Sequence, residues 1–124
     1  MPHILVVDDN PDMHAALRAA LSHAGVEVAD ALSGKQALQQ ARSRWPDAVV
    51  LDLELHGALS GWDTWRELRT LAAGRSLKVV VVSGDLAGLL QARDEGADDA
   101  VSKRKPPADI VLRILRVLNP TEAR

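Results

Sequence analysis

The chain has 124 residues, no cysteine and a formal charge of −2 from 15 basic and 17 acidic side chains. This length suits one domain with a single core, and the missing thiols exclude disulfides and thiolate metal sites. The scattered basic residues argue against a nucleic-acid-binding face, and no apolar stretch or leader is typical of a membrane span or a signal peptide. We therefore expect a cytoplasmic protein that binds neither nucleic acid nor a membrane.

The first half of the chain alternates apolar runs with helix signals. Its predicted elements are, in order, a strand at 3–7, a helix from 10 to about 24, a short strand at 26–29 and a helix at 33–45. Asn10 and Pro11 suit the start of a helix, and Gly25 suits its end. Pro46 prevents the second helix from continuing. The alternation at 26–29 is typical of a strand near the edge of a sheet.

The second half continues the same alternation. Its predicted elements are a strand at 48–52, a loop at 56–60, a helix at 61–71, a strand at 78–82, a helix at 86–95, a strand at 99–102 and a helix at 108–118. The continuous apolar run that leads into Asp52 predicts a strand buried on both faces, as in a parallel sheet. Gly88 should weaken the helix that contains it.

Five strand–helix units with short connections predict an α/β protein, with helices on both faces of a parallel sheet. The economical arrangement is the flavodoxin-like, doubly wound (βα)5 fold with strand order 2-1-3-4-5. In that order the first, third and fourth strands are central, and they are the most apolar runs of the chain. We expect a single domain over residues 1–120, followed by a tail at 121–124.

Polar residues end or directly follow four of the predicted strands, and a parallel sheet brings the carboxyl ends of its strands to one edge. The residues expected there are Asp8, Asp9, Asp52, Ser83 and Lys103. Three clustered carboxylates repel one another, and a divalent cation relieves that repulsion. Oxygen ligands without cysteine or clustered histidine select Mg²⁺. The dispersed histidines, namely His3, His14, His23 and His56, are expected at the surface instead.

The same residue types suit phosphoryl chemistry. A hydroxyl and an ammonium opposite the metal would hold the oxygens of a phosphoryl group. Asp52 is central, so it is the natural nucleophile for an aspartyl-phosphate, with Asp8 and Asp9 as metal ligands. Taken singly, Ser83 would be read as a turn residue and Lys103 as part of a solvated basic run.

Four segments carry a family resemblance over essentially the whole chain. They are ILVVDDN at 4–10, VLDL at 50–53, VVSG at 81–84 and GADD at 96–99, which precedes Lys103. Together they resemble the receiver domain of two-component response regulators, the CheY-like superfamily. The resemblance implies that Asp52 accepts a phosphoryl group from a phosphohistidine on a sensor histidine kinase or phosphotransfer protein. It also implies Mg²⁺ bound directly by Asp9, largely through water by Asp8, and by the backbone carbonyl of Glu54.

By the same resemblance, Ser83 would move to hydrogen-bond the phosphoryl group and Lys103 would pair with it. The family usually has Lys-Pro after the fifth strand, and here that pair occurs only at Lys105–Pro106, so Lys105 is the alternative partner. Ala100 stands where the family has a switch aromatic, so the usual coupling of hydroxyl movement to ring rotation cannot operate in its usual form. The loop after the third strand is one residue longer than the commonest form, with His56 where proline is usual.

Two acids are expected to affect the lifetime of the phosphoryl group. Glu54 and Asp85 stand two residues beyond the acceptor and the hydroxyl, and in receivers these positions border the path of the attacking water. Trp62, just after Gly61, is expected to lie near enough to the site to report on ligand binding by its fluorescence.

The resemblance implies a signalling switch rather than a turnover enzyme, one that assists only its own phosphorylation and dephosphorylation. The alternative is a non-phosphorylated interaction module, which Ala100 favours. An aspartyl-phosphate phosphatase is a third reading, and the sequence Asp52-Leu53-Glu54 lacks the Asp-x-Asp expected of it. Leu112 and Val117 are candidates for a homodimer or partner face. No output domain is visible, so a stand-alone receiver and a piece of a longer regulator remain open.

Overall fold

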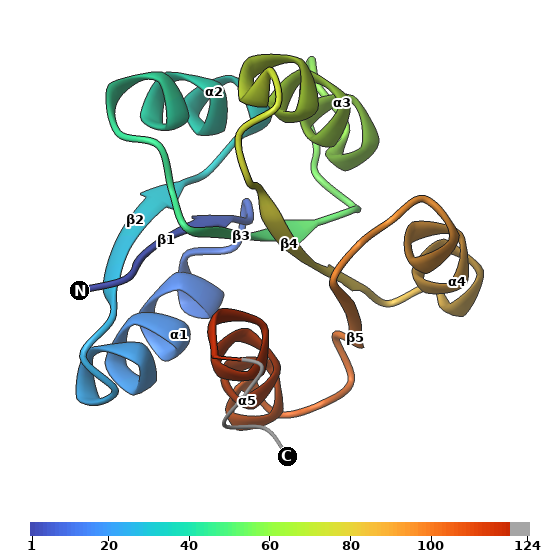
Figure 1. The fold of residues 1–124 in the computed structure, drawn as a ribbon. Helices are drawn as coiled ribbons and strands as arrows, with labels where there is room; N and C mark the ends of the chain where they lie inside the picture. Colours follow the sequence, from blue (N-terminus) through green and yellow to red (C-terminus); the bar gives the residue numbers. More distant parts are fainter. Residues whose placement is uncertain (120–124) are drawn as a thin grey trace.

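The computed structural model describes residues 1–119, in which parallel strands alternate with helices (Figure 1). The strands are β1 His3–Val7, β2 Glu27–Ala31, β3 Ala48–Asp52, β4 Lys78–Ser83 and β5 Asp99–Ser102. The helices are α1 Pro11–His23, α2 Gly34–Ser43, α3 Gly61–Ala72, α4 Leu86–Asp94 and α5 Pro107–Leu118. Over these residues, no helix is both long enough and apolar enough to cross a membrane. The predicted tail at 121–124 lies outside the described residues, and the domain bounds stay a prediction.

The sheet has the order β2-β1-β3-β4-β5, and every neighbouring pair is parallel. This confirms the predicted flavodoxin-like fold, including the edge position of β2. In Figure 1, α1 and α5 lie together on one side of the sheet, and α2 and α3 lie on the other. Buried side chains of α4 join the same apolar cluster as those of α2 and α3, so this helix covers the second face as well.

Alternate residues of the central strands point to opposite faces and build two apolar cores, one on each face of the sheet, rather than the single core expected from the chain length. In β1, Leu5 and Val7 join the cluster under α2, α3 and α4, whereas Ile4 and Val6 join the cluster under α1 and α5. Burial on both faces is the reason that these strands read as continuous apolar runs. With no Phe or Tyr in the chain, the cores consist mainly of Val, Leu, Ile and Ala, with Trp65 as a buried aromatic.

Several helices begin at a side chain that accepts a hydrogen bond from the first turn. Asn10 caps α1 in this way, as predicted, and Ser33 and Asp85 cap α2 and α4. Ser60 and Asp63 form a reciprocal capping box at the start of α3. Such caps satisfy backbone N–H groups that have no partner inside the helix.

Two predicted elements, β2 and α2, were wrong by two residues at their carboxyl ends, and the other bounds agree to within one residue. Strand β2 covers 27–31 rather than 26–29, because it pairs with the whole of β1, from Glu27 opposite His3 to Ala31 opposite Val7. Helix α2 ends at Ser43, so Trp45, which the predicted helix at 33–45 included, lies beyond its end.

Trp45 lies outside the helix because it precedes Pro46, and proline disfavours helical geometry in the residue before it. Its indole N–H instead donates to the carbonyl oxygen of Ser76, 3.1 Å away. The guanidinium of Arg75 lies over the ring, 4.1 Å from its centroid. Trp45 therefore anchors the chain between α2 and β3 to the connector before β4.

Candidate functional site

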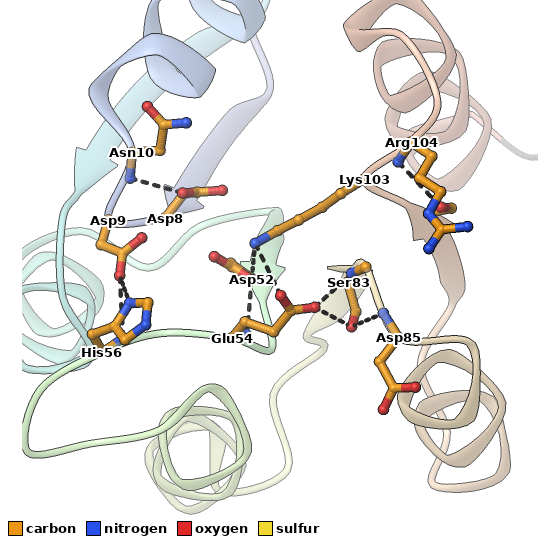
Figure 2. Close-up of polar contacts among 12 residues, drawn as sticks. Asp8, Asp9, Asn10, Asp52, Glu54, His56, Ser83, Asp85, Lys103 and Arg104 are labelled. Atoms are coloured by element: carbon orange, nitrogen blue, oxygen red, sulfur yellow. Dashed lines mark hydrogen bonds and ion pairs between the residues drawn. The ribbon is translucent and has the colours of Figure 1, made fainter.

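The five predicted site residues lie at the carboxyl edge of the sheet (Figure 2). Asp8 and Asp9 follow β1, and Lys103 follows β5. Asp52 and Ser83 are the last residues of β3 and β4. Backbone hydrogen bonds between neighbouring strands continue into the loops: the N–H of Lys103 donates to the carbonyl oxygen of Ser83, 3.0 Å away. The site is therefore held by the sheet itself.

The three aspartates form one cluster. Each of Asp8, Asp9 and Asp52 offers a carboxylate oxygen, and these oxygens lie within 4.8 Å of one another. Burial raises the pKa of Asp8, the hydrogen bond from the N–H of Asn10 at 2.8 Å opposes that shift, and the charge of Asp52 adds to it. The surroundings of Asp8 therefore disfavour its ionised form.

Asp52 is 1% exposed, and its two oxygens differ in their contacts. Its Oδ1 accepts from Lys103 Nζ at 2.9 Å and from the backbone N–H of Glu54 at 2.8 Å. Among residues 1–119, its Oδ2 has no hydrogen-bond partner. A buried carboxylate oxygen without a partner is unfavourable. Oδ2 is therefore the atom of Asp52 available to a metal ion or a reacting group.

Asp9 differs from the other two acids because it has a histidine partner. His56 Nδ1 lies 2.6 Å from Asp9 Oδ2, and the His56 backbone N–H donates to the same oxygen at 3.2 Å. The side-chain hydrogen bond from His56 is the main reason that the pKa of Asp9 is lowered. The lengthened loop after β3 thus reaches the loop after β1, a contact that the sequence did not predict.

Glu54 makes contacts that sequence reasoning missed, because only its carbonyl and its nearness to the site were predicted. Ser83 Oγ donates to Glu54 Oε1 at 2.6 Å, and the Gly84 N–H donates to the same oxygen at 2.5 Å. Its Oε2 lies 3.7 Å from Lys103 Nζ. The hydrogen bonds from Ser83 and Gly84 lower the pKa of Glu54, and the charge of Lys103 adds to them.

Lys103 lies between the acids (Figure 2). Burial lowers its pKa, but the hydrogen bond to Asp52 and the charges of Asp52, Glu54 and Asp8 outweigh burial and leave the pKa raised. Lys105 is exposed, and its backbone N–H donates to the carbonyl oxygen of Ser102. Of these two lysines, the structure therefore places the ammonium of Lys103 beside Asp52.

The prediction that His3 and His14 lie at the surface was wrong, because both are buried. His14 Nε2 lies 2.7 Å from the carbonyl oxygen of Asp8, and its Nδ1 lies 2.8 Å from Asp30 Oδ1. The imidazole therefore ties the loop after β1 to β2. The sequence carried a signal for this position, since His14 precedes the buried Leu17 by three residues and Leu21 by seven.

Asp85 lies beside the site rather than in it, and Trp62 lies at the start of α3. The N–H of Asp85 donates to Ser83 Oγ at 3.0 Å, while its carboxylate caps α4. Trp62 is in the first turn of α3, partly buried, with its ring 5.8 Å from that of Trp65. Its use as a fluorescent reporter remains a prediction.

The donor set fits a hard divalent cation. It offers three carboxylates, no thiolate, and a buried oxygen of Asp52 that lacks a partner. Mg²⁺ is bound in proteins by carboxylate oxygens of this kind together with water and phosphate oxygens.

Comparisons with known proteins converge on one family. The family model for the response regulator receiver domain matches residues 4–115. The transcriptional regulatory protein PrrA of Mycobacterium tuberculosis is 33% identical over 117 residues, covering 94% of this chain and 50% of PrrA. KdpE of the same organism, also a transcriptional regulatory protein, is 40% identical over 105 residues, covering 83% of this chain and 45% of KdpE.

A solved structure gives the same result. The crystal structure of a response regulator receiver domain protein from Clostridium thermocellum matches with a TM-score of 0.83 at 26% identity, covering 99% of this chain and 98% of that one. By contrast, the chain spans about half the length of the curated relatives that it matches.

Proposed function

This chain belongs to the family of response regulator receiver domains, which are signalling switches, and from that premise we propose that Asp52 is its phosphoryl acceptor. The observation that carries the proposal is the carboxylate of Asp52. It is buried, its Oδ1 is paired with Lys103, and its Oδ2 has no partner among the described residues. The carboxylate of Asp52 therefore still has an oxygen available to contact a ligand.

The proposed reaction moves one phosphoryl group. The carboxylate of Asp52 attacks the phosphorus of a phosphohistidine on a sensor histidine kinase or phosphotransfer protein. The new P–O bond forms as the P–N bond breaks, and the histidine nitrogen keeps the electron pair. Ser83 and Lys103 would stabilise the charge on the phosphoryl oxygens. Later attack by water on phosphorus restores the carboxylate and releases inorganic phosphate, so the domain assists only its own chemistry.

We propose Mg²⁺ as the cofactor, held by the carboxylates of Asp8, Asp9 and Asp52 and by the backbone carbonyl of Glu54. Asp9 would bind it directly and Asp8 largely through water. Bound there, Mg²⁺ would offset the repulsion within the acidic cluster and the charge of the phosphoryl oxygens.

The proposed partners are a sensor kinase upstream and a protein or an attached output domain downstream, in the cytoplasm. The relatives PrrA and KdpE are transcriptional regulators about twice as long as this chain. Leu112 on α5 is an exposed large apolar residue, whereas Val117 packs partly against the core. Leu112 is therefore the better candidate for a partner or homodimer face.

One observation favours the alternative of a non-phosphorylated interaction module. Ala100 is buried in β5 without a ring to relay movement of the Ser83 hydroxyl.

A labelling experiment separates the two functions. Incubation with a small-molecule phosphodonor and Mg²⁺ should label the wild type and Asp94→Ala, a variant of an exposed acid on α4, but not Asp52→Ala. Equal labelling of wild type and Asp52→Ala would contradict the assignment of the acceptor. No labelling of the wild type together with no Mg²⁺ binding would support the interaction module.

A further inference from the structure

The carboxylate of Glu54 lies in an anion-binding site made by the loops at the carboxyl edge of the sheet. The hydroxyl of Ser83 donates to it at 2.6 Å and the backbone N–H of Gly84 at 2.5 Å, and the ammonium of Lys103 forms an ion pair with it at 3.7 Å. Figure 2 shows Glu54 reaching from the end of β3 across to the end of β4, beneath the Lys103 side chain. A hydroxyl, an N–H group and an ammonium that converge on one anion form a general oxyanion site.

The same donors face the proposed acceptor. Lys103 Nζ lies 2.9 Å from Asp52 Oδ1, so one ammonium serves both Asp52 and Glu54. A phosphoryl group on Asp52 would bring charged terminal oxygens that need donors of this kind. A hydroxyl hydrogen or an N–H can serve one strong acceptor at a time, so the Glu54 carboxylate and a phosphoryl oxygen would compete for them.

On the basis of the proposed function, we propose that Glu54 is a tethered competitor of the phosphoryl group. Its carboxylate must leave Ser83 and Gly84 before phosphoryl oxygens can bind there. Phosphorylation then exchanges one anion for another at these donors and releases the loop after β3 from the loop after β4.

The surroundings of Glu54 permit that exchange. Its side chain is 46% exposed, so the released carboxylate can turn into water rather than remain as a buried unpaired charge. Ser83 Oγ is already directed towards the site, where it is held by Glu54 and by the N–H of Asp85. In this chain the part that moves on phosphorylation is therefore Glu54 and its loop, and no aromatic ring is needed at Ala100 to follow the hydroxyl.

Binding of a phosphoryl analogue tests the competition. Beryllofluoride with Mg²⁺ is titrated into the wild type, Glu54→Ala and Glu54→Gln, with calorimetry as the readout. We expect about three- to tenfold tighter binding to Glu54→Ala, the range for loss of a partly exposed, charge-assisted competitor. Glu54→Gln should lie between the two. Glu67→Gln, which removes an exposed acid on α3, is the matched control and should bind like the wild type.

A second readout needs neither metal nor analogue. In ¹⁵N-resolved spectra, the amide resonance of Gly84 should shift in Glu54→Ala, which removes its carboxylate acceptor, and stay in place in Glu67→Gln. Glu54→Asp should show the same shift, because its side chain is one methylene too short to keep the hydrogen bond to the Gly84 N–H.

The outcomes separate this inference from the proposed function. If the wild type is labelled on Asp52 but Glu54→Ala binds the analogue no more tightly, or the Gly84 amide does not respond, the competition is refuted and the acceptor stands. If neither the wild type nor any variant binds the analogue or is labelled, both proposals fail.

Discussion

Single residues in the acidic site carry opposing electrostatic effects. Burial and the neighbouring Asp52 raise the pKa of Asp8, so its negative charge destabilises the folded state. A hydrogen bond to His56 lowers the pKa of Asp9, so the charge of that residue stabilises it. Two adjacent aspartates at the end of one strand therefore contribute to stability with opposite sign.

Replacement of Asp8 by asparagine should stabilise the domain when metal is removed with EDTA. The asparagine oxygen can still accept the N–H of Asn10, while the unfavourable charge is gone. We expect the free energy of unfolding in urea to rise by about 0.5–2 kcal/mol at neutral pH, the usual range for single stabilising substitutions. Asp12→Asn, at an exposed acid in α1, is the control.

The difference in unfolding free energy between Asp8→Asn and the wild type should depend on pH, with a sign that the raised pKa of Asp8 determines. Because the pKa of Asp8 is raised in the folded state, its ionisation penalty is complete above that pKa and disappears as the folded protein takes up the proton. The stability advantage of Asp8→Asn should therefore shrink as the pH falls from the raised pKa towards the ordinary aspartate value. An advantage that grows on acidification would contradict the pKa assignment.

The two candidate lysines can be separated by stability alone. In Lys103→Met, the buried carboxylate of Asp52 loses its ammonium and keeps only the N–H of Glu54. We expect a loss of about 1–3 kcal/mol of unfolding free energy, less than for a fully buried pair because Lys103 is partly exposed. Lys105→Met, at an exposed position, should stay within about 0.5 kcal/mol of the wild type. The reverse order would contradict the observed pairing.

The convergence of the five site residues was predictable from the sequence, because it follows from the backbone course of parallel strands. Parallel strands end at one edge, so Asp52, Ser83 and Lys103 meet whatever their side-chain torsions. The contacts of Glu54 and His56 depend on how loop side chains turn, which hydrophobic periodicity does not encode. The burial of His14 could have been predicted, since its helical spacing from Leu17 is regular.

At the scale of elements, close approach of α3 to β3 sets the geometry around the acceptor. A Cβ on Gly61 would lie 2.4 Å from the carbonyl oxygen of Asp52 and 2.5 Å from Leu53 Cα. These neighbours are backbone atoms, so a side chain at this position would force the start of α3 away from the end of β3.

Two glycine-to-alanine changes should therefore have opposite effects. Gly61→Ala should lower the unfolding free energy by about 1–3 kcal/mol, the usual cost of overpacking. Gly88→Ala, inside α4, meets only ordinary contacts at 3.6 Å or more and should raise it by about 0.5–1 kcal/mol through helix propensity. Urea denaturation of both variants checks the pair, and stabilisation by Gly61→Ala would contradict the described packing.

Element types were predictable along the whole alternation, and the bounds of β2 and α2 differed for separate reasons. The pattern at 26–29 could not show that β2 would follow the full length of its partner β1. The helix predicted at 33–45 included Trp45, but this residue precedes Pro46 and its ring instead contacts the guanidinium of Arg75. Tertiary pairing with β1 thus decided the bounds of β2, whereas Pro46 limited α2.

At the scale of the whole molecule, metal binding should appear as stability. A ligand that binds only the folded state adds about 2.7 kcal/mol at a concentration of 100 times its Kd. We expect Mg²⁺ to raise the melting temperature of the wild type in a concentration-dependent way, and to do so much less for Asp9→Ala. Asp94→Ala should respond like the wild type, and an equal response of Asp9→Ala would contradict its role as a ligand.

The hydrogen bonds of Glu54 affect which anions can bind at Ser83 and Gly84, those free in solution or those bonded to Asp52. A group held on a short tether acts at an effective concentration on the order of millimolar or above. Inorganic phosphate diffusing in solution must exceed that concentration to displace the Glu54 carboxylate from Ser83 and Gly84. A phosphoryl group bonded to Asp52 is tethered as well, so it competes with the Glu54 carboxylate at a similar effective concentration. The donors on Ser83 and Gly84 would thus bind a phosphoryl group attached to Asp52 in preference to free inorganic phosphate.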